Sequence, residues 1–206
     1  SEAVIKTFVK LYQKKIVYKD TKLVNWDTKL ETAISDLEVE QKEVQSNLYY
    51  IKYKIENEDN FLTIATTRPE TMLGDTAVAI NPEDLRYKKY IGKEIIVPIV
   101  ERKVKIIADK YVSIEQGSGA LKVTPAHDFN DFEIGKRHKL EFINIFEKNG
   151  TLNHTVPKEL IGLDRFEARS VIVKTLKEKQ LLEKIENIKN AVPYGDRSNS
   201  IIEPLL

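Results

Sequence analysis

Short apolar segments with the alternation of β-strands follow one another closely along this 206-residue chain, and few helical segments separate them. In the clearest case Tyr49, Ile51, Tyr53 and Ile55 occupy every second position, and the apolar run 61–65 follows after a turn, which predicts a hairpin. Further strands are expected at 23–27, 37–40, 94–100, 103–108, 121–124 and 141–146. Strands this close together argue against a regular βαβ repeat, so the pattern predicts an α+β fold with a mixed, barrel-like β core.

Helical segments are expected at the periphery of this core. Apolar residues recur at helical spacing between Ala3 and Ile16, and Asp164 with Glu167 forms a capping box at the start of another helix. Further helices are expected at 83–90 and 128–138.

The charge of the chain is almost balanced, with 33 Lys and Arg against 32 Asp and Glu and a formal net charge of +1. Proteins that hold nucleic acid by electrostatic attraction alone usually carry a large basic excess, so this chain is not expected to grip RNA strongly by itself. The absence of cysteine excludes a disulfide framework, a thiolate zinc site and a cysteine nucleophile.

The sequence contains no apolar run of the roughly 18 residues that would suggest a membrane span, and its first residues lack the apolar core of a signal peptide. We therefore expect a cytoplasmic protein with no membrane partner. The chain begins without Met and ends in the apolar run 201–206, so we expect a piece of a longer protein.

The first polar segment directly follows the second strand of the hairpin, where a rigid scaffold can hold a loop. A capping box would account for Thr67 and Glu70. Capping does not account for Thr66, Arg68 or Thr71, which are therefore candidate binding residues.

The second polar segment begins in the strand at 121–124. Lys122 and Thr124 are two positions apart and share one face, where they either meet solvent or line a polar pocket. Asp128 and Asp131 stand three apart at a helix start, so both can approach one ligand. The alternative for the two aspartates is a helix N-cap with an acid in the first turn.

His127 raises the question of a metal site together with the two aspartates that follow it. We do not favour this interpretation, because the two other histidines have no ligand-like spacing. The run Gly117-Ser118-Gly119 lacks the context of a nucleophile elbow or of a phosphate loop and predicts a tight turn. Together the residues imply a small polar pocket with carboxylates for an amine and no obvious protein general base.

The two segments, Thr-Thr-Arg-Pro-Glu-Thr-Met-Leu-Gly-Asp-Thr-Ala-Val-Ala at 66–79 and Lys-Val-Thr-Pro-Ala-His-Asp-Phe-Asn-Asp at 122–131, closely resemble the editing domain inserted in valyl-tRNA synthetase. The stretches 23–27, 35–40 and 195–206 resemble the ribbon that joins this insert to the catalytic body. Where this chain has Thr-Thr-Arg-Pro-Glu at 66–70, the isoleucyl family usually has Trp-Thr-Thr-Thr-Pro-Trp. The leucyl family typically lacks Lys-x-Thr before Pro-Ala-His-Asp. The resemblance implies a helix and ribbon at 1–46, an editing core at 47–190 and a returning ribbon strand at 191–206.

The function that this resemblance implies is hydrolysis of threonine wrongly esterified to the acceptor end of tRNA(Val). A site that selects valine by shape cannot strongly reject threonine, and valyl-tRNA synthetase, with about 10²-fold discrimination, is the usual example of this limit. By the resemblance, Asp131 binds the amino group, Asp128 accepts from the threonine hydroxyl, and Lys122 with Thr124 completes the polar wall. The other expected substrate-binding residues are Thr66, Thr67, Arg68, Thr71 and His127.

The resemblance also implies partners and cofactors. The partners are the mischarged acceptor end and the catalytic body of the same synthetase, and the isolated chain is expected to be a monomer. No metal or cofactor is expected for this chain; ATP and Mg²⁺ would serve the full-length synthetase only. Neither a Lys-Met-Ser-Lys-Ser loop nor His-x-Gly-His occurs, so no ligase activity is expected here. The alternatives are a catalytically silent module that binds the tRNA end, and an editing domain of the isoleucyl or leucyl relatives.

Overall fold

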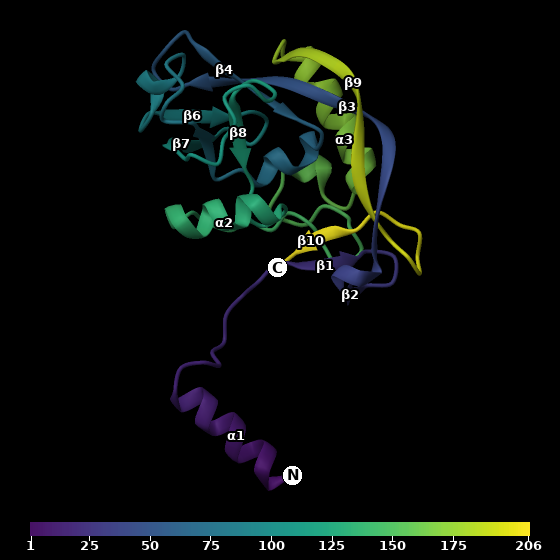
Figure 1. Ribbon diagram of the computed structural model, residues 1–206. Coiled ribbons are helices and arrows are strands. Elements are labelled where there is room, and N and C mark those ends of the chain that lie inside the picture. The colour runs from purple at the N-terminus through teal and green to yellow at the C-terminus, as the bar shows by residue number, and fades with distance from the viewer.

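A strongly curved mixed sheet forms the body of the protein, as the computed structural model of residues 1–206 shows (Figure 1). Seven strands take part, in the order β4-β3-β6-β7-β5-β8, with β9 paired to β3. The strands of this sheet are β3 (Val39–Ile55), β4 (Phe61–Thr66), β5 (Ala77–Ile80), β6 (Glu94–Val97), β7 (Arg102–Ala108), β8 (Ala120–Val123) and β9 (Leu182–Gly195). Because β4 and β8, at the two ends of this order, lie against each other, the sheet curls into a half-barrel. This confirms the predicted α+β fold with a barrel-like core.

Apolar side chains at alternate positions of the central strands fill the inside of the curved sheet. Tyr53, Ile55 and Ile64 have no exposed surface, while Lys54 on the same hairpin is exposed. The helices α2 (Phe129–His138) and α3 (Arg165–Glu178) pack against the body. Ala168, Ile172 and Leu176 of α3 recur at helical spacing and are fully buried in the main core. The predicted 49–55 and 61–65 hairpin is confirmed by its antiparallel register.

A long two-stranded ribbon connects the body to a smaller sheet. β3 and β9 pair from Val39 with Gly195 to Ile51 with Leu182. The smaller sheet has the order β10-β1-β2, from β1 (Val24–Asp27), β2 (Thr32–Ile34) and β10 (Glu203–Leu205). The indole nitrogen of Trp26 donates to the Lys148 carbonyl at 2.7 Å, which ties this sheet to the body. The domain boundaries predicted after residues 46 and 190 lie within the ribbon and stay a prediction.

The helix α1 (Glu2–Gln13) stands away from the body, as the purple segment in Figure 1 shows, and none of its residues is buried. Its position confirms the helix expected between Ala3 and Ile16, although its apolar face is exposed. None of the helices in the structure has both the length and the apolar character that a membrane span requires.

Two predicted elements are wrong because side chains bind the backbone there. Residues 83–90 form turns and the short 3₁₀ segment η3 (Lys88–Tyr90) instead of a helix. The carboxylate of Asp84 accepts from the backbone N–H of Arg86, and Asn81 Oδ1 accepts from Glu83 N–H, so local side-chain bonds replace helical ones.

Residues 141–146 likewise form no regular strand and make only an isolated bridge from Phe146 to Leu152. The Ile145 N–H donates to His127 Nε2, and the Asn144 carbonyl accepts from the Asn153 side chain. Within 37–40, a 3₁₀ turn, η1 (Asp36–Glu38), precedes β3, so this strand begins two residues later than expected. The other 3₁₀ segments are η2 (Pro69–Gly74) and η4 (Lys158–Leu160).

Candidate functional site

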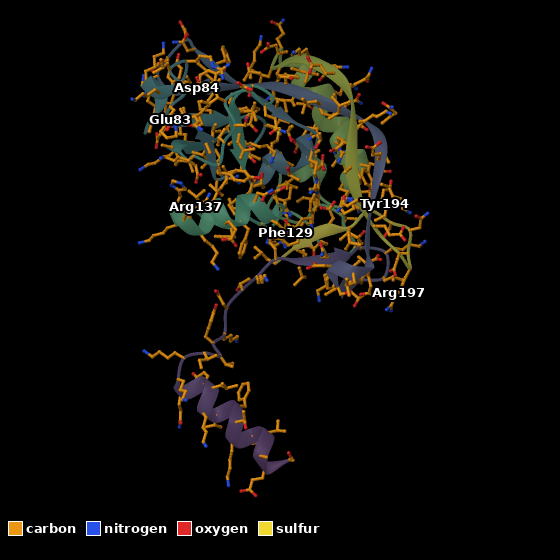
Figure 2. The ribbon with its side chains drawn as sticks, viewed as in Figure 1. Glu83, Asp84, Phe129, Arg137, Tyr194 and Arg197 are labelled. Atoms are coloured by element: carbon orange, nitrogen blue, oxygen red, sulfur yellow. The ribbon has the colours of Figure 1, made fainter.

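The two polar segments meet at one side of the half-barrel. β4 leads into the loop 67–76, and β8 leads into α2, so both segments follow strands that lie side by side. The backbone N–H of Thr76 donates to the Val123 carbonyl at 3.0 Å and joins the segments directly. Figure 2 marks the start of α2 by Phe129, beside β10, and its far end by Arg137.

A cavity of about 180 Å³ opens between these segments. All nine predicted site residues line it: Thr66, Thr67, Arg68, Thr71, Lys122, Thr124, His127, Asp128 and Asp131. Drug-sized ligands usually occupy about 300–1,000 Å³, so this cavity suits a molecule of amino-acid size. Two larger cavities, of about 610 and 530 Å³, also border Thr67, so the small pocket opens toward space for a larger group.

A buried chain of hydrogen bonds forms the floor of the pocket. Lys122 is 7% exposed, and its ammonium lies 3.3 Å from Asp75 Oδ1 and contacts the Thr124 hydroxyl. The Thr124 hydroxyl donates to Asp75 Oδ1 at 2.6 Å, and the Tyr53 hydroxyl donates to Asp75 Oδ2 at 2.8 Å. Burial raises the pKa of Asp75, and the Lys122 charge opposes this rise.

Sequence reasoning named Lys122 and Thr124 but missed their partner Asp75, which is fully buried. Asp75 belongs to the first motif, and the strand that follows it, β5, was not predicted. An alternation signal was absent there because all four residues of β5 are buried. Tyr53 was predicted on a strand, but nothing in its sequence context indicates that its hydroxyl reaches Asp75.

Asp131 lies in the wall of the pocket and is 5% exposed. Its Oδ2 accepts from the Thr124 backbone N–H at 2.8 Å. Burial raises the pKa of the Asp131 carboxyl to about 7, although the Lys122 charge opposes the shift. The carboxyl therefore titrates near neutral pH, and a cation bound beside it would stabilise its ionised form.

Asp128 is exposed at the mouth of the pocket and caps α2. Its Oδ1 accepts from the backbone N–H groups of Asn130 and Asp131, at 2.8 and 3.1 Å. The capping interpretation of this residue is therefore confirmed. Its second carboxylate oxygen makes no hydrogen bond within the protein and can face a ligand.

The first segment is organised by its own side chains rather than by a capping box. The Thr66 hydroxyl accepts from the Arg68 N–H at 3.0 Å, and the Thr71 hydroxyl donates to the Arg68 carbonyl at 2.9 Å. The capping box predicted from Thr67 and Glu70 is wrong, because η2 has no side-chain cap. Glu70 instead turns inward and accepts two hydrogen bonds from Arg169.

His127 is 1% exposed and has a structural contact. Its Nε2 accepts from the Ile145 N–H at 3.0 Å, which requires the neutral ring, and burial lowers its pKa well below the usual value. The ring meets Phe146 edge to face. The Ile145 contact occupies Nε2, whereas the other ring nitrogen, Nδ1, is buried without a hydrogen-bond partner. The turn predicted at Gly117-Ser118-Gly119 is confirmed, since Gly117 and Gly119 have φ of 61° and 80°.

Known proteins are similar to this chain along its whole length. A family model described as tRNA synthetases class I (I, L, M and V) matches residues 1–197. A valine–tRNA ligase of Pelagibacter ubique is 65% identical over 206 residues, covering 100% of this chain and 24% of that protein. A valine–tRNA ligase of Mesorhizobium japonicum is 50% identical over 230 residues, covering 100% of this chain and 25% of that protein.

A solved structure shares the fold. It is described as the ternary complex of Agrobacterium radiobacter K84 agnB2 LeuRS-tRNA-LeuAMS, and it matches with a TM-score of 0.56 and 17% identity over 90% of this chain and 31% of that chain. The chain thus spans about a quarter of the length of the relatives named above. From its family match and from homologues along its entire length, the chain belongs to the class I tRNA synthetases and corresponds to a segment of valine–tRNA ligase.

Proposed function

We propose that this segment removes threonine from tRNA(Val) by hydrolysis. Water attacks the ester carbonyl carbon, the bond from this carbon to the ribose oxygen breaks, and the products are free threonine and the 3′-terminal hydroxyl of the tRNA. The observation that carries the proposal is the small pocket in which Asp131, Lys122 and Thr124 are buried together. Valine–tRNA ligase relatives make tRNA(Val) the expected carrier of the ester.

Asp131 is the proposed partner of the substrate's α-amino group. The Thr124 N–H engages only Asp131 Oδ2, so the other oxygen is available to a ligand. An ammonium group placed there supplies the positive charge that the buried carboxyl lacks. This pairing explains why a carboxyl group with a pKa of about 7 is retained in the wall of the pocket.

Selection of threonine over valine depends on the oxygens that the protein leaves unpaired. Lys122 and Thr124 are paired with Asp75 and with each other, so they hold the shape of the polar wall. The free oxygen of Asp128 is then the proposed acceptor for the threonine hydroxyl. Valine offers no donor in this place, so it lacks the charge-assisted hydrogen bond that threonine would make to Asp128.

The test is incubation of this chain with threonyl-tRNA(Val) and valyl-tRNA(Val), with ester loss and binding measured separately. Faster loss of threonine than of valine supports hydrolysis, and Asp131→Ala and Asp128→Ala are each expected to slow it sharply. The proposal needs no metal ion, so a chelator should leave the rate unchanged. Full rates in both aspartate variants would show that the pocket is not the site of reaction. Binding without ester loss would indicate a silent tRNA-binding module instead.

A further inference from the structure

The guanidinium of Arg68 joins three separate parts of the protein. Its Nε donates to Glu70 in its own loop at 3.3 Å, and its Nη1 donates to the His127 carbonyl at 3.2 Å. Its Nη2 donates to Glu203 of β10. All three nitrogens of the group are therefore engaged by the protein, which favours positioning over direct contact with substrate.

Glu203 is the residue of β10 that joins the cluster of charged groups around Arg68, and it is 4% exposed. One carboxylate oxygen contacts Arg68, and the other lies 2.9 Å from Arg165 Nε of α3. Arg165 also donates to the Ile201 carbonyl at 3.1 Å, just before β10. The returning strand is thus fastened at its start to α3 and, through Glu203, to the loop that borders the pocket.

Glu70 completes the cluster from the side of the loop. It has no exposed surface, and both its oxygens accept from Arg169 of α3, at 2.7 and 2.8 Å. The Glu70 carboxylate is fully buried, so losing an arginine partner would leave its charge without compensation. The cluster therefore resists small displacements of Arg68.

We propose that Glu203 and Arg68 form a positioning pair through which the returning strand β10 holds the two pocket segments in register. Arg68 fixes the loop 66–71 through its own backbone, and it fixes the second segment through the His127 carbonyl, one residue before Asp128. The pocket is consequently complete only when β10 is seated. This inference rests on the proposed hydrolysis, because the rate of that reaction is what the pair controls.

The test uses the full-length synthetase that contains this segment, with residues numbered as here. Glu203→Gln keeps the shape of the side chain and removes its charge, so Arg68 loses its anchor on β10. We expect kcat for threonyl-tRNA(Val) deacylation to fall by about 10- to 100-fold, since small misplacements of catalytic groups have effects of this size. The KM is expected to stay within about twofold, because Glu203 is 4% exposed and offers little surface to RNA. Glu203→Asp, which keeps the charge, is expected to restore most of kcat.

Glu38→Gln is the matched control, because Glu38 also lies next to the ribbon and pairs with an arginine, Arg197. Figure 2 shows Arg197 at the outer end of the ribbon, away from the start of α2 that Phe129 marks. This variant should keep wild-type kcat, because neither Glu38 nor Arg197 contacts Arg68 or Glu203. A purely stabilising role for Glu203 predicts instead that Glu203→Gln loses kcat only in proportion to unfolding.

The possible outcomes distinguish a failure of the positioning pair from a failure of the proposed hydrolysis. A wild-type enzyme that leaves threonyl-tRNA(Val) intact overturns both. An active wild type with unchanged kcat in Glu203→Gln overturns the pair alone. If Glu203→Gln does not fold, Arg68→Lys carries the test, because lysine keeps the charge but cannot reach the same three acceptors. A tenfold or larger loss of kcat in that folded variant supports the pair, and a wild-type rate overturns it.

Discussion

Asp131 has a protonation state that depends on its surroundings in the folded chain. Burial raises its pKa to about 7, while in the unfolded chain water solvates the carboxylate and the ordinary value of 3.8 applies. Above neutral pH the folded protein must therefore hold an incompletely compensated anion in the pocket wall. The cost of this anion is recovered when a cationic amine binds beside it, which links the stability of the free protein to its substrate.

The stability of an Asp131→Asn variant tests this link. Between the unfolded pKa and the folded pKa, the native state binds a proton that the unfolded state has lost, so the free energy of unfolding falls as pH rises through this range. Asparagine carries no such cost and can still accept from the Thr124 N–H. We expect the variant to be more stable than wild type by about 1 to 3 kcal/mol at about pH 8, with the difference vanishing near about pH 4. Urea unfolding followed by circular dichroism measures it, and equal stabilities at both pH values would contradict it.

The pH dependence of deacylation follows from the same residue. Because only the ionised carboxylate attracts the ammonium group, kcat/KM for threonyl-tRNA(Val) should rise with pH and level off above an inflection near 7. Rates are measured from about pH 5.5 to 8.5 and corrected for spontaneous ester hydrolysis. Asp131→Asn should show a low rate with no inflection, whereas a wild-type profile without an inflection between about pH 6 and 8 would exclude this role.

At the scale of elements, the pocket depends on how closely η2 packs against the end of β8. Gly74, the last residue of η2, has an ordinary backbone conformation, so conformational freedom is not the reason for glycine here. A Cβ at this position would lie 3.0 Å from the Ile143 carbonyl oxygen and 3.2 Å from Thr124 Cγ2. Glycine therefore permits the close approach that brings Asp75 to Lys122 and Thr124.

Gly74→Ala is expected to separate these two elements. The added methyl group must push η2 away from Thr124, at a cost of about 1 to 3 kcal/mol in the free energy of unfolding. Deacylation should fall even where the variant is fully folded, because the bonds to Asp75 lengthen. Gly92→Ala is the matched control: its φ of 84° costs stability, but its Cβ would meet nothing within 4 Å and lies outside the pocket. The two variants are compared by melting temperature and by single-turnover rate, and equal rates would contradict the packing role of Gly74.

At the scale of the whole molecule, the ribbon and the body form one structure while α1 does not join them. β3 and β9 stay paired from the smaller sheet into the half-barrel, and Trp26 binds the body at Lys148. In contrast, no residue of α1 is buried, and Val4 and Phe8 on its apolar side are 67% and 56% exposed. The stability of the body should therefore be independent of α1.

Removal of residues 1–19 tests this independence. The truncated chain retains the contact between Asp20 and Lys136 and all of the strands. We expect its melting temperature to stay within about 2 °C of the longer chain, since exposed residues contribute little to folding free energy. Its rate of threonyl-tRNA(Val) deacylation should also be unchanged. A clearly lower melting temperature would mean that α1 packs on the body in solution.

Local sequence patterns were sufficient to predict some of the strands and helices. Alternation located the hairpin of β3 and β4, and capping signals located the starts of α2 and α3, because these features depend on neighbours within a few residues. The same reasoning failed at residues 83–90 and 141–146, where side chains bind the backbone. It also failed at β5, whose four buried residues show no alternation.

For the site, the amino-acid sequence by itself determined which residue types are present, and its two motifs indicated the protein family. Only the tertiary structure decided what the buried charged groups contact: Asp75 lies under Lys122, and Glu203 lies on Arg68. The physical reason is that burial and pairing set the pKa of a carboxyl group and the orientation of a guanidinium. Both depend on residues that are distant along the chain and become neighbours only when the sheet curls.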